Sequence, residues 1–127
     1  MQPQMETQRI KVGLFKSAND FRTYKAGETI FAEGNPGEEM FVVRKGTVSL
    51  KISGQQIVTA EEDETFGEMA LIDGRTRSAT AQAVTDCEVV PIDSRRFLFL
   101  VHQTPNFALI MLRVLANRLR TMDAAVK

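Results

Sequence analysis

The chain has 127 residues, and its 16 basic and 16 acidic side chains give a formal net charge of zero. With 43% hydrophobic and 25% charged residues, this is the composition of one globular domain rather than of a polybasic nucleic-acid binder. No apolar run approaches the roughly 18 residues of a membrane span, and the N-terminus lacks the apolar core of a signal peptide, so we expect a cytoplasmic protein. A single cysteine, Cys87, and a single histidine, His102, exclude an internal disulfide and argue against a metal centre or other cofactor.

Most of the chain up to residue 92 has the pattern of antiparallel β-structure. Residues 1–17 are polar and predict an N-terminal arm, ahead of a domain that covers residues 18–127. Short segments rich in Val, Ile, Thr and Phe then alternate with glycine turns, and Val48, Leu50 and Ile52 share one strand face. The predicted strands are residues 21–25, 28–31, 40–45, 47–53, 56–60, 78–84 and 87–92, with a further one ending at Phe66. The predicted fold is mainly β, an eight-stranded antiparallel jelly-roll barrel (a cupin-like double-stranded β-helix), followed by two C-terminal helices.

The two helices follow a change of hydrophobic period from two to about 3.6 after Ile92. Asp93 is the expected N-cap of a helix over residues 94–103. Thr104 as N-cap, with Pro105 at the first helical position, opens a second helix over residues 105–122.

The second helix carries more apolar surface than a single packing stripe requires. One interpretation is that it is wedged into a groove of its own domain; the favoured one is that one face packs on the β body and the other on a second copy. The sequence therefore predicts a homodimer through helix 105–122. One apolar face holds Leu109, Leu112, Ala116 and Leu119, and the adjoining face holds Phe107, Ile110, Met111 and Val114.

The segment Phe66–Thr80 has the pattern of an anion site. A strand ends at Phe66, and Gly67 begins a helical turn over residues 68–72 whose free N–H groups favour an anion. Arg77 can return to the same place with a guanidinium fork for phosphate oxygens, and Ser78 adds a small donor. Glu68 suits a sugar hydroxyl. Together these groups describe a small nucleotide, although spacing alone also allows a structural Glu68–Arg77 ion pair.

The same segment resembles a known family. The letters FGEMAL and, after a short loop, TRSAT are similar to the phosphate-binding cassette of the cyclic nucleotide-binding domain, F-G-E-x-A-L and then P-R-[A/S/T]-A-T. Gly27–Val43, followed by Gly46, resembles the opening strands of that family. The resemblance covers roughly residues 14–122. Thr76 departs from it, because the family often has a proline there, and the loop loses some stiffness.

The resemblance implies a jelly roll that holds cyclic AMP or cyclic GMP. Arg77 would pair with the cyclic phosphate, Glu68 would accept from the ribose 2′-hydroxyl, and backbone amides would complete the phosphate site. The serine at position 78 makes the segment similar to the catabolite-activator group of the family. In that group the last helix also forms the dimer contact and covers the base. The implied ligand-binding residues are Gly67, Glu68, Met69, Ala70, Arg77 and Ser78, with Arg120, Met122 and Asp123 as a possible purine lid.

The function expected from the sequence is a non-enzymatic regulatory module, with no catalytic residues, that binds a cyclic nucleotide and signals to a protein partner through its C-terminal helix. The alternatives are a ligand-free jelly-roll dimerisation domain and a cupin-type enzyme, whose histidine cluster His102 alone does not supply. Direct DNA binding is not expected, because the charge is balanced and no residues remain for a recognition helix.

Overall fold

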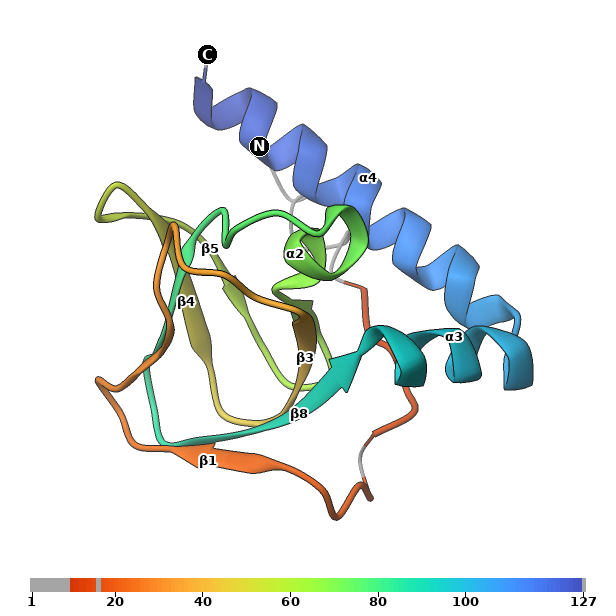
Figure 1. Ribbon diagram of the computed structural model, residues 1–127. Helices are drawn as coiled ribbons and strands as arrows, with labels where there is room; N and C mark the ends of the chain where they lie inside the picture. Colours follow the sequence, from red (N-terminus) through yellow and green to blue (C-terminus); the bar gives the residue numbers. More distant parts are fainter. Residues whose placement is uncertain (1–9, 16, 127) are drawn as a thin grey trace, which may run out of the picture.

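The computed structural model describes residues 10–15 and 17–126, with side chains described as far as Arg120. Two β-sheets form the body of the molecule, and two consecutive helices lie along one side of it (Figure 1). The strands are β1 (Arg22–Tyr24), β2 (Thr29–Phe31), β3 (Glu39–Lys45), β4 (Val48–Ile52), β5 (Gln55–Ala60), β6 (Thr65–Phe66), β7 (Thr80–Ala83) and β8 (Cys87–Asp93); the helices are α2 (Glu68–Asp73), α3 (Ser94–Gln103) and α4 (Asn106–Val126).

The sheets have the orders β1-β8-β3-β6 and β2-β7-β4-β5, and every pairing is antiparallel. The predicted mainly β, antiparallel body with helices after it is therefore confirmed. The hydrogen bonds join the described strands into two four-stranded sheets.

The first sheet is buried on both faces because the side chains of its central strands alternate. Phe41 and Val43 of β3 point into the core between the sheets, where they join residues of the second sheet. Met40 and Val42 point the other way, toward Phe107 and Met111. This sheet is thus the layer on which both the second sheet and the helices rest.

The helices begin close to where the sequence predicts. The side chain of Asp93 accepts a hydrogen bond from the Arg96 N–H at 2.8 Å, which confirms it as the N-cap of α3. Phe97 meets Phe107 edge to face, with ring centroids 5.3 Å apart, and so joins the two helices. The last helix begins one residue after Pro105 and continues to Val126, beyond its predicted end at residue 122. In the described part of the chain, no helix combines the length and the apolarity that a membrane span needs.

Part of the predicted N-terminal arm packs on this body. Val12 and Phe15 are buried against the helix-facing side of the first sheet. Asp63 holds the segment in place, since its carboxylate oxygens both lie 2.9 Å from the Gly13 N–H and its backbone oxygen accepts from the Val12 N–H at 2.9 Å.

Candidate functional site

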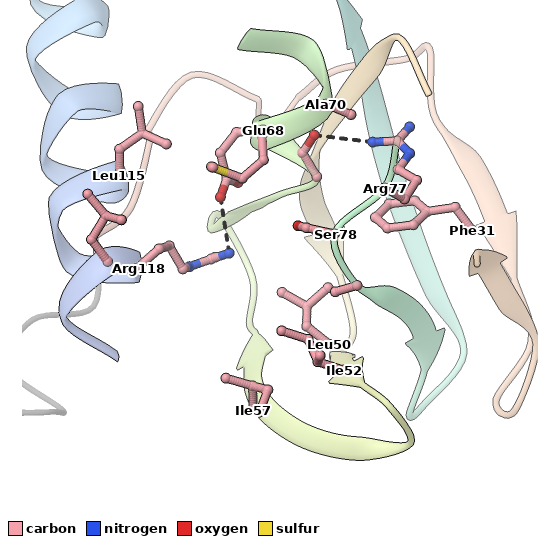
Figure 2. A pocket seen from close by; sticks show the side chains of 14 residues that line it. Phe31, Leu50, Ile52, Ile57, Glu68, Ala70, Arg77, Ser78, Leu115 and Arg118 are labelled. Atoms are coloured by element: carbon pink, nitrogen blue, oxygen red, sulfur yellow. Dashed lines mark hydrogen bonds and ion pairs between the residues drawn. The ribbon is translucent and has the colours of Figure 1, made fainter. Parts of the chain in front are cut away.

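A pocket opens between the second sheet, α2 and the later part of α4 (Figure 2). All six residues that the sequence singled out as ligand contacts line it, which brings the two halves of the predicted motif together. The lining residues are Phe31, Leu50, Ile52, Ile57, Gly67, Glu68, Met69, Ala70, Arg77, Ser78, Ala79, Leu115, Arg118 and Leu119.

Helix α2 starts at a glycine for two physical reasons. Gly67 has φ +78°, a left-handed conformation that side chains with a Cβ rarely adopt. A Cβ there would also lie 3.0 Å from Nη1 of Arg77 and 3.2 Å from the ring of Phe31. The first-turn N–H groups of a helix have no intrahelical acceptor, and this turn lies at the pocket wall. The backbone therefore offers donors where the sequence predicted them.

Arg77 is buried beside that turn, with 6% of its surface exposed. Its Nη1 donates to the backbone oxygen of Glu39 at 2.7 Å and to that of Gly67 at 3.2 Å. Its guanidinium carbon lies 4.0 Å from the centre of the Phe31 ring. Burial lowers the pKa of Arg77, and the nearby Glu39 carboxylate partly offsets this effect. The side chain keeps its positive charge, because arginine is not deprotonated in proteins. The guanidinium thus lies next to Gly67, as expected, with backbone carbonyls as its partners.

Glu68 is the buried carboxylate of the pocket, 2% exposed. Its Oε2 lies 3.3 Å from Nη1 of Arg118, so the alternative Glu68–Arg77 ion pair is wrong: Glu68 pairs with α4 instead. Nη2 of Arg118 also donates to the backbone oxygen of Thr65 at 2.5 Å. The other carboxylate oxygen, Oε1, is buried and has no hydrogen-bond partner among the described residues.

Arg118 is a pocket residue that the sequence pattern did not reveal. Arg118 and Glu68 are 50 positions apart, and no local spacing rule connects them. The available signal was on the helix itself, where Arg118 lies between Leu115 and Leu119, which also line the pocket. A cation on an apolar helix face indicates a buried anionic partner.

The proposed purine lid is only partly described. Arg120 is exposed and is not one of the residues that line the pocket. The side chains of Met122 and Asp123 lie outside the described residues. The wall that α4 does provide consists of Leu115, Arg118 and Leu119.

The pocket is narrow and mostly apolar. Its cavity volume is about 80 Å³, against the roughly 300–1,000 Å³ typical of small-molecule sites. Among the described residues, no cluster of three His, Cys, Asp or Glu side chains is placed to hold a metal ion.

The family model of the cyclic nucleotide-binding domain matches residues 21–104. The chain belongs to this family. Within the family, it is 36% identical over 107 residues to the "Cyclic AMP receptor protein" of Thermus thermophilus, a match that covers 80% of this chain and 50% of the receptor. The chain thus spans about half the length of that relative.

Solved structures of the family have the same fold. The structure of "Thermus thermophilus Catabolite Activator Protein" is 33% identical with a TM-score of 0.72, and the match covers 84% of this chain and 53% of that one. A second structure, solved under the description "A cyclic-GMP-dependent signalling pathway regulates bacterial phytopathogenesis", is 27% identical with a TM-score of 0.70. That match covers 79% of this chain and 84% of that one.

Proposed function

We propose that this domain binds cyclic AMP or cyclic GMP in the pocket under α4 and acts as a regulatory module without chemistry of its own. The observation that carries the proposal is the convergence of Gly67, Glu68, Arg77 and Ser78 on one pocket beside an apolar sheet. The family match over residues 21–104 supports it. In this proposal the two sheets are the halves of a jelly roll.

The cyclic phosphate lies between the first turn of α2 and Arg77. The turn supplies backbone N–H donors, and Ser78 adds a hydroxyl beside them. Nε of Arg77 is buried without a hydrogen-bond partner in the described part of the chain, so a phosphate oxygen would satisfy a donor that is now unpaired.

The nucleoside has matching surfaces around the phosphate site. The ribose 2′-hydroxyl donates to Glu68, whose buried Oε1 offers an open acceptor. The purine packs against apolar side chains of the second sheet and of α4, namely Leu50, Ile52, Ile57, Leu115 and Leu119.

We propose both cyclic AMP and cyclic GMP as candidate ligands. Measured affinities determine which of the two the pocket prefers. The name of the Thermus receptor refers to cyclic AMP, and the description of the second solved structure refers to cyclic GMP. Ser78 is compatible with both, because its hydroxyl can accept as well as donate.

We include signalling through α4 in the proposal, and the small volume of the cavity supports it. In this proposal, ligand entry displaces one wall of the pocket. We assign the movement to the later part of α4, because its pocket-lining residue Leu119 is 62% exposed. A ligand shifts such an equilibrium by its differential affinity for the two helix positions. We include a homodimer in the proposal, because Leu109 and Leu112 are 44% and 62% exposed on the face of α4 opposite the body.

A second candidate function is a dimerisation domain that binds no ligand, and the small cavity favours it. Calorimetric titration with cyclic AMP, cyclic GMP and 5′-AMP separates the two. We expect one binding site per chain for at least one cyclic nucleotide and no heat with 5′-AMP. An absence of binding for both cyclic nucleotides at millimolar concentration would overturn the proposal and leave the dimerisation domain.

A further inference from the structure

An ion pair between Arg22 of β1 and Glu39 of β3 lies next to the proposed phosphate site, although neither residue lines the pocket. We infer that Arg22 is a positioning residue for this site: it binds the Glu39 carboxylate and so keeps it from pairing with Arg77, whose guanidinium the ligand phosphate binds. The inference rests on the proposed function and deepens it, because it assigns to a residue of β1 the role of keeping the phosphate site open.

Arg22 binds the Glu39 carboxylate at both of its oxygens. Nη1 of Arg22 donates to Oε1 at 3.1 Å, and Nη2 donates to Oε2 at 2.9 Å. Two parallel hydrogen bonds from one guanidinium fix the direction of a carboxylate more firmly than a single contact. The two side chains are 48% and 31% exposed, and pairs so close to solvent add little to stability. The effect of Arg22 is therefore on where the carboxylate points.

Glu39 is also joined to Arg77. Its backbone oxygen accepts from Nη1 of Arg77 at 2.7 Å, and its side chain belongs to the same face of β3 as Phe41. The guanidinium carbons of Arg22 and Arg77 lie 5.7 and 5.8 Å from the centre of the Phe41 ring. Burial lowers the pKa of Arg77 and the Glu39 carboxylate raises it, so this carboxylate already acts on the buried guanidinium. One carboxylate thus has two guanidinium groups within reach.

Arg77 is a buried cation that has no carboxylate partner among the described residues. Figure 2 shows its side chain beside the ring of Phe31. Glu39 and Gly67 give it only backbone oxygens, and its Nε has no hydrogen-bond partner in the described part of the chain. A cation removed from water is costly unless an anion pairs with it. Without Arg22, the Glu39 carboxylate would be free to become that anion, and a phosphate would have to displace it.

The test measures dissociation constants by calorimetry with cyclic AMP and cyclic GMP. The proteins are the wild type, Arg22→Met, Glu39→Gln and the double variant, all at one salt concentration because salt screens these charges. Arg44→Met is the matched control: Arg44 forms an ion pair with Glu88 in the same sheet, and neither of these residues lines the pocket. A thermal melt of each variant shows whether it is folded.

We expect Arg22→Met to weaken binding by about tenfold, roughly the value of one hydrogen bond to a charged group, because the ligand then competes with the Glu39 carboxylate. Glu39→Gln should bind at least as tightly as the wild type, since the amide has no charge with which to hold Arg77. In the Glu39→Gln background, Arg22→Met should change the affinity by less than about twofold. Arg44→Met should leave the affinity unchanged. Arg22→Lys keeps the charge and should retain most of the affinity; it replaces Arg22→Met if that variant does not fold.

Two outcomes overturn the inference while the proposed function stands. In one, the wild type binds a cyclic nucleotide and Arg22→Met binds it equally well. In the other, Arg22→Met weakens binding by the same factor in the wild-type and the Glu39→Gln backgrounds, which would show that the lost positive charge acts on the ligand without Glu39. A wild type that binds neither cyclic nucleotide overturns the proposed function, and the inference with it.

Discussion

Arg77 is the residue on which the proposed phosphate site depends. We expect Arg77→Ala to weaken cyclic nucleotide binding by about 2–4 kcal/mol, roughly 30- to 1,000-fold, because a buried charge-assisted pair is lost. Calorimetry measures the affinity, and Arg75→Ala is the control, since Arg75 is an exposed arginine two positions away. An unchanged dissociation constant in Arg77→Ala would reject the assigned role. The melting temperature should also fall, because the backbone oxygens of Glu39 and Gly67 lose their donor.

Gly37 makes room for the Arg77 side chain. A Cβ at position 37 would lie 2.1 Å from Nε and 2.4 Å from Cζ of Arg77. The surrounding loop is tied to the same residue, since the Gly34 N–H donates to the backbone oxygen of Arg77 at 2.9 Å and the Arg77 N–H donates to that of Asn35 at 2.8 Å. The loop therefore has little freedom to retreat from a side chain at position 37.

We expect Gly37→Ala to displace the guanidinium and to lower cyclic nucleotide affinity by about tenfold or more, the value of a disturbed charge-assisted contact. The affinity is measured by calorimetry, with a thermal melt on the same sample. Gly54→Ala is the control for backbone effects: Gly54 has φ +81°, and a Cβ there would meet no atom within 4 Å, so the substitution strains the backbone without contacting Arg77. Equal affinities for the two variants would contradict the role of Gly37.

Cys87 is a buried thiol in the core between the sheets. Burial raises its pKa, and the carboxylates of Asp86 and Glu28 raise it further. Because the folded pKa lies above the unfolded value of about 8.5, the thiol's contribution to stability is complete below that pH and is lost as the pH rises through the folded pKa. We expect the unfolding free energy in urea to fall between pH 8 and 10 more steeply for the wild type than for Cys87→Ala. A wild-type curve parallel to that of the variant would show that the thiol does not titrate differently on folding.

The sequence predicted those helices and strands whose signals lie in residues close together along the chain. Alternating apolar residues marked β4, the Asp93 cap marked the start of α3, and Gly67 marked the start of α2. The same reasoning did not reveal that Val12 and Phe15 are buried, because two apolar residues in a polar segment form no period.

Contacts between residues far apart in the sequence could not be predicted from local sequence patterns. The pairing of Glu68 with Arg118 and the narrowness of the cavity arise only when α4 is laid over the sheet. The resemblance identified residues 66–80 as a phosphate-binding segment. Only the structure shows that the Arg77 guanidinium donates to the backbone oxygens of Glu39 and Gly67.

Helix α4 is held unevenly along its length. Phe107, Met111 and Val114 are buried on the body in its first half. Beyond Val114, the pocket-lining residues Leu115, Arg118 and Leu119 remain, and Leu119 is 62% exposed. The buried apolar contacts of α4 are therefore concentrated in its first half. The proposed movement of the second half would have to release the contacts of Arg118 with Glu68 and Thr65.

The proposed homodimer would form through the exposed leucines of α4, Leu109 and Leu112. We expect Leu112→Glu to convert a dimer into a monomer, because it places a charge on the apolar face without touching the body. Light scattering at high protein concentration, with and without cyclic nucleotide, measures the mass. Arg113→Glu, a charge change at the neighbouring exposed position, is the control. A wild type that is monomeric under all these conditions would contradict the proposed interface.

The proposed movement of α4 would be largest at its C-terminal end. The twelve residues beyond Val114 span about 18 Å at 1.5 Å per residue, so a small tilt at the pocket becomes a larger displacement at the far turn. Its exposed outer surface can carry a dye at Arg120, with a second dye in the exposed Ser53–Gly54 turn of the opposite sheet. Energy transfer between the two dyes would report occupancy directly, and the domain would then serve as an optical sensor of its own ligand.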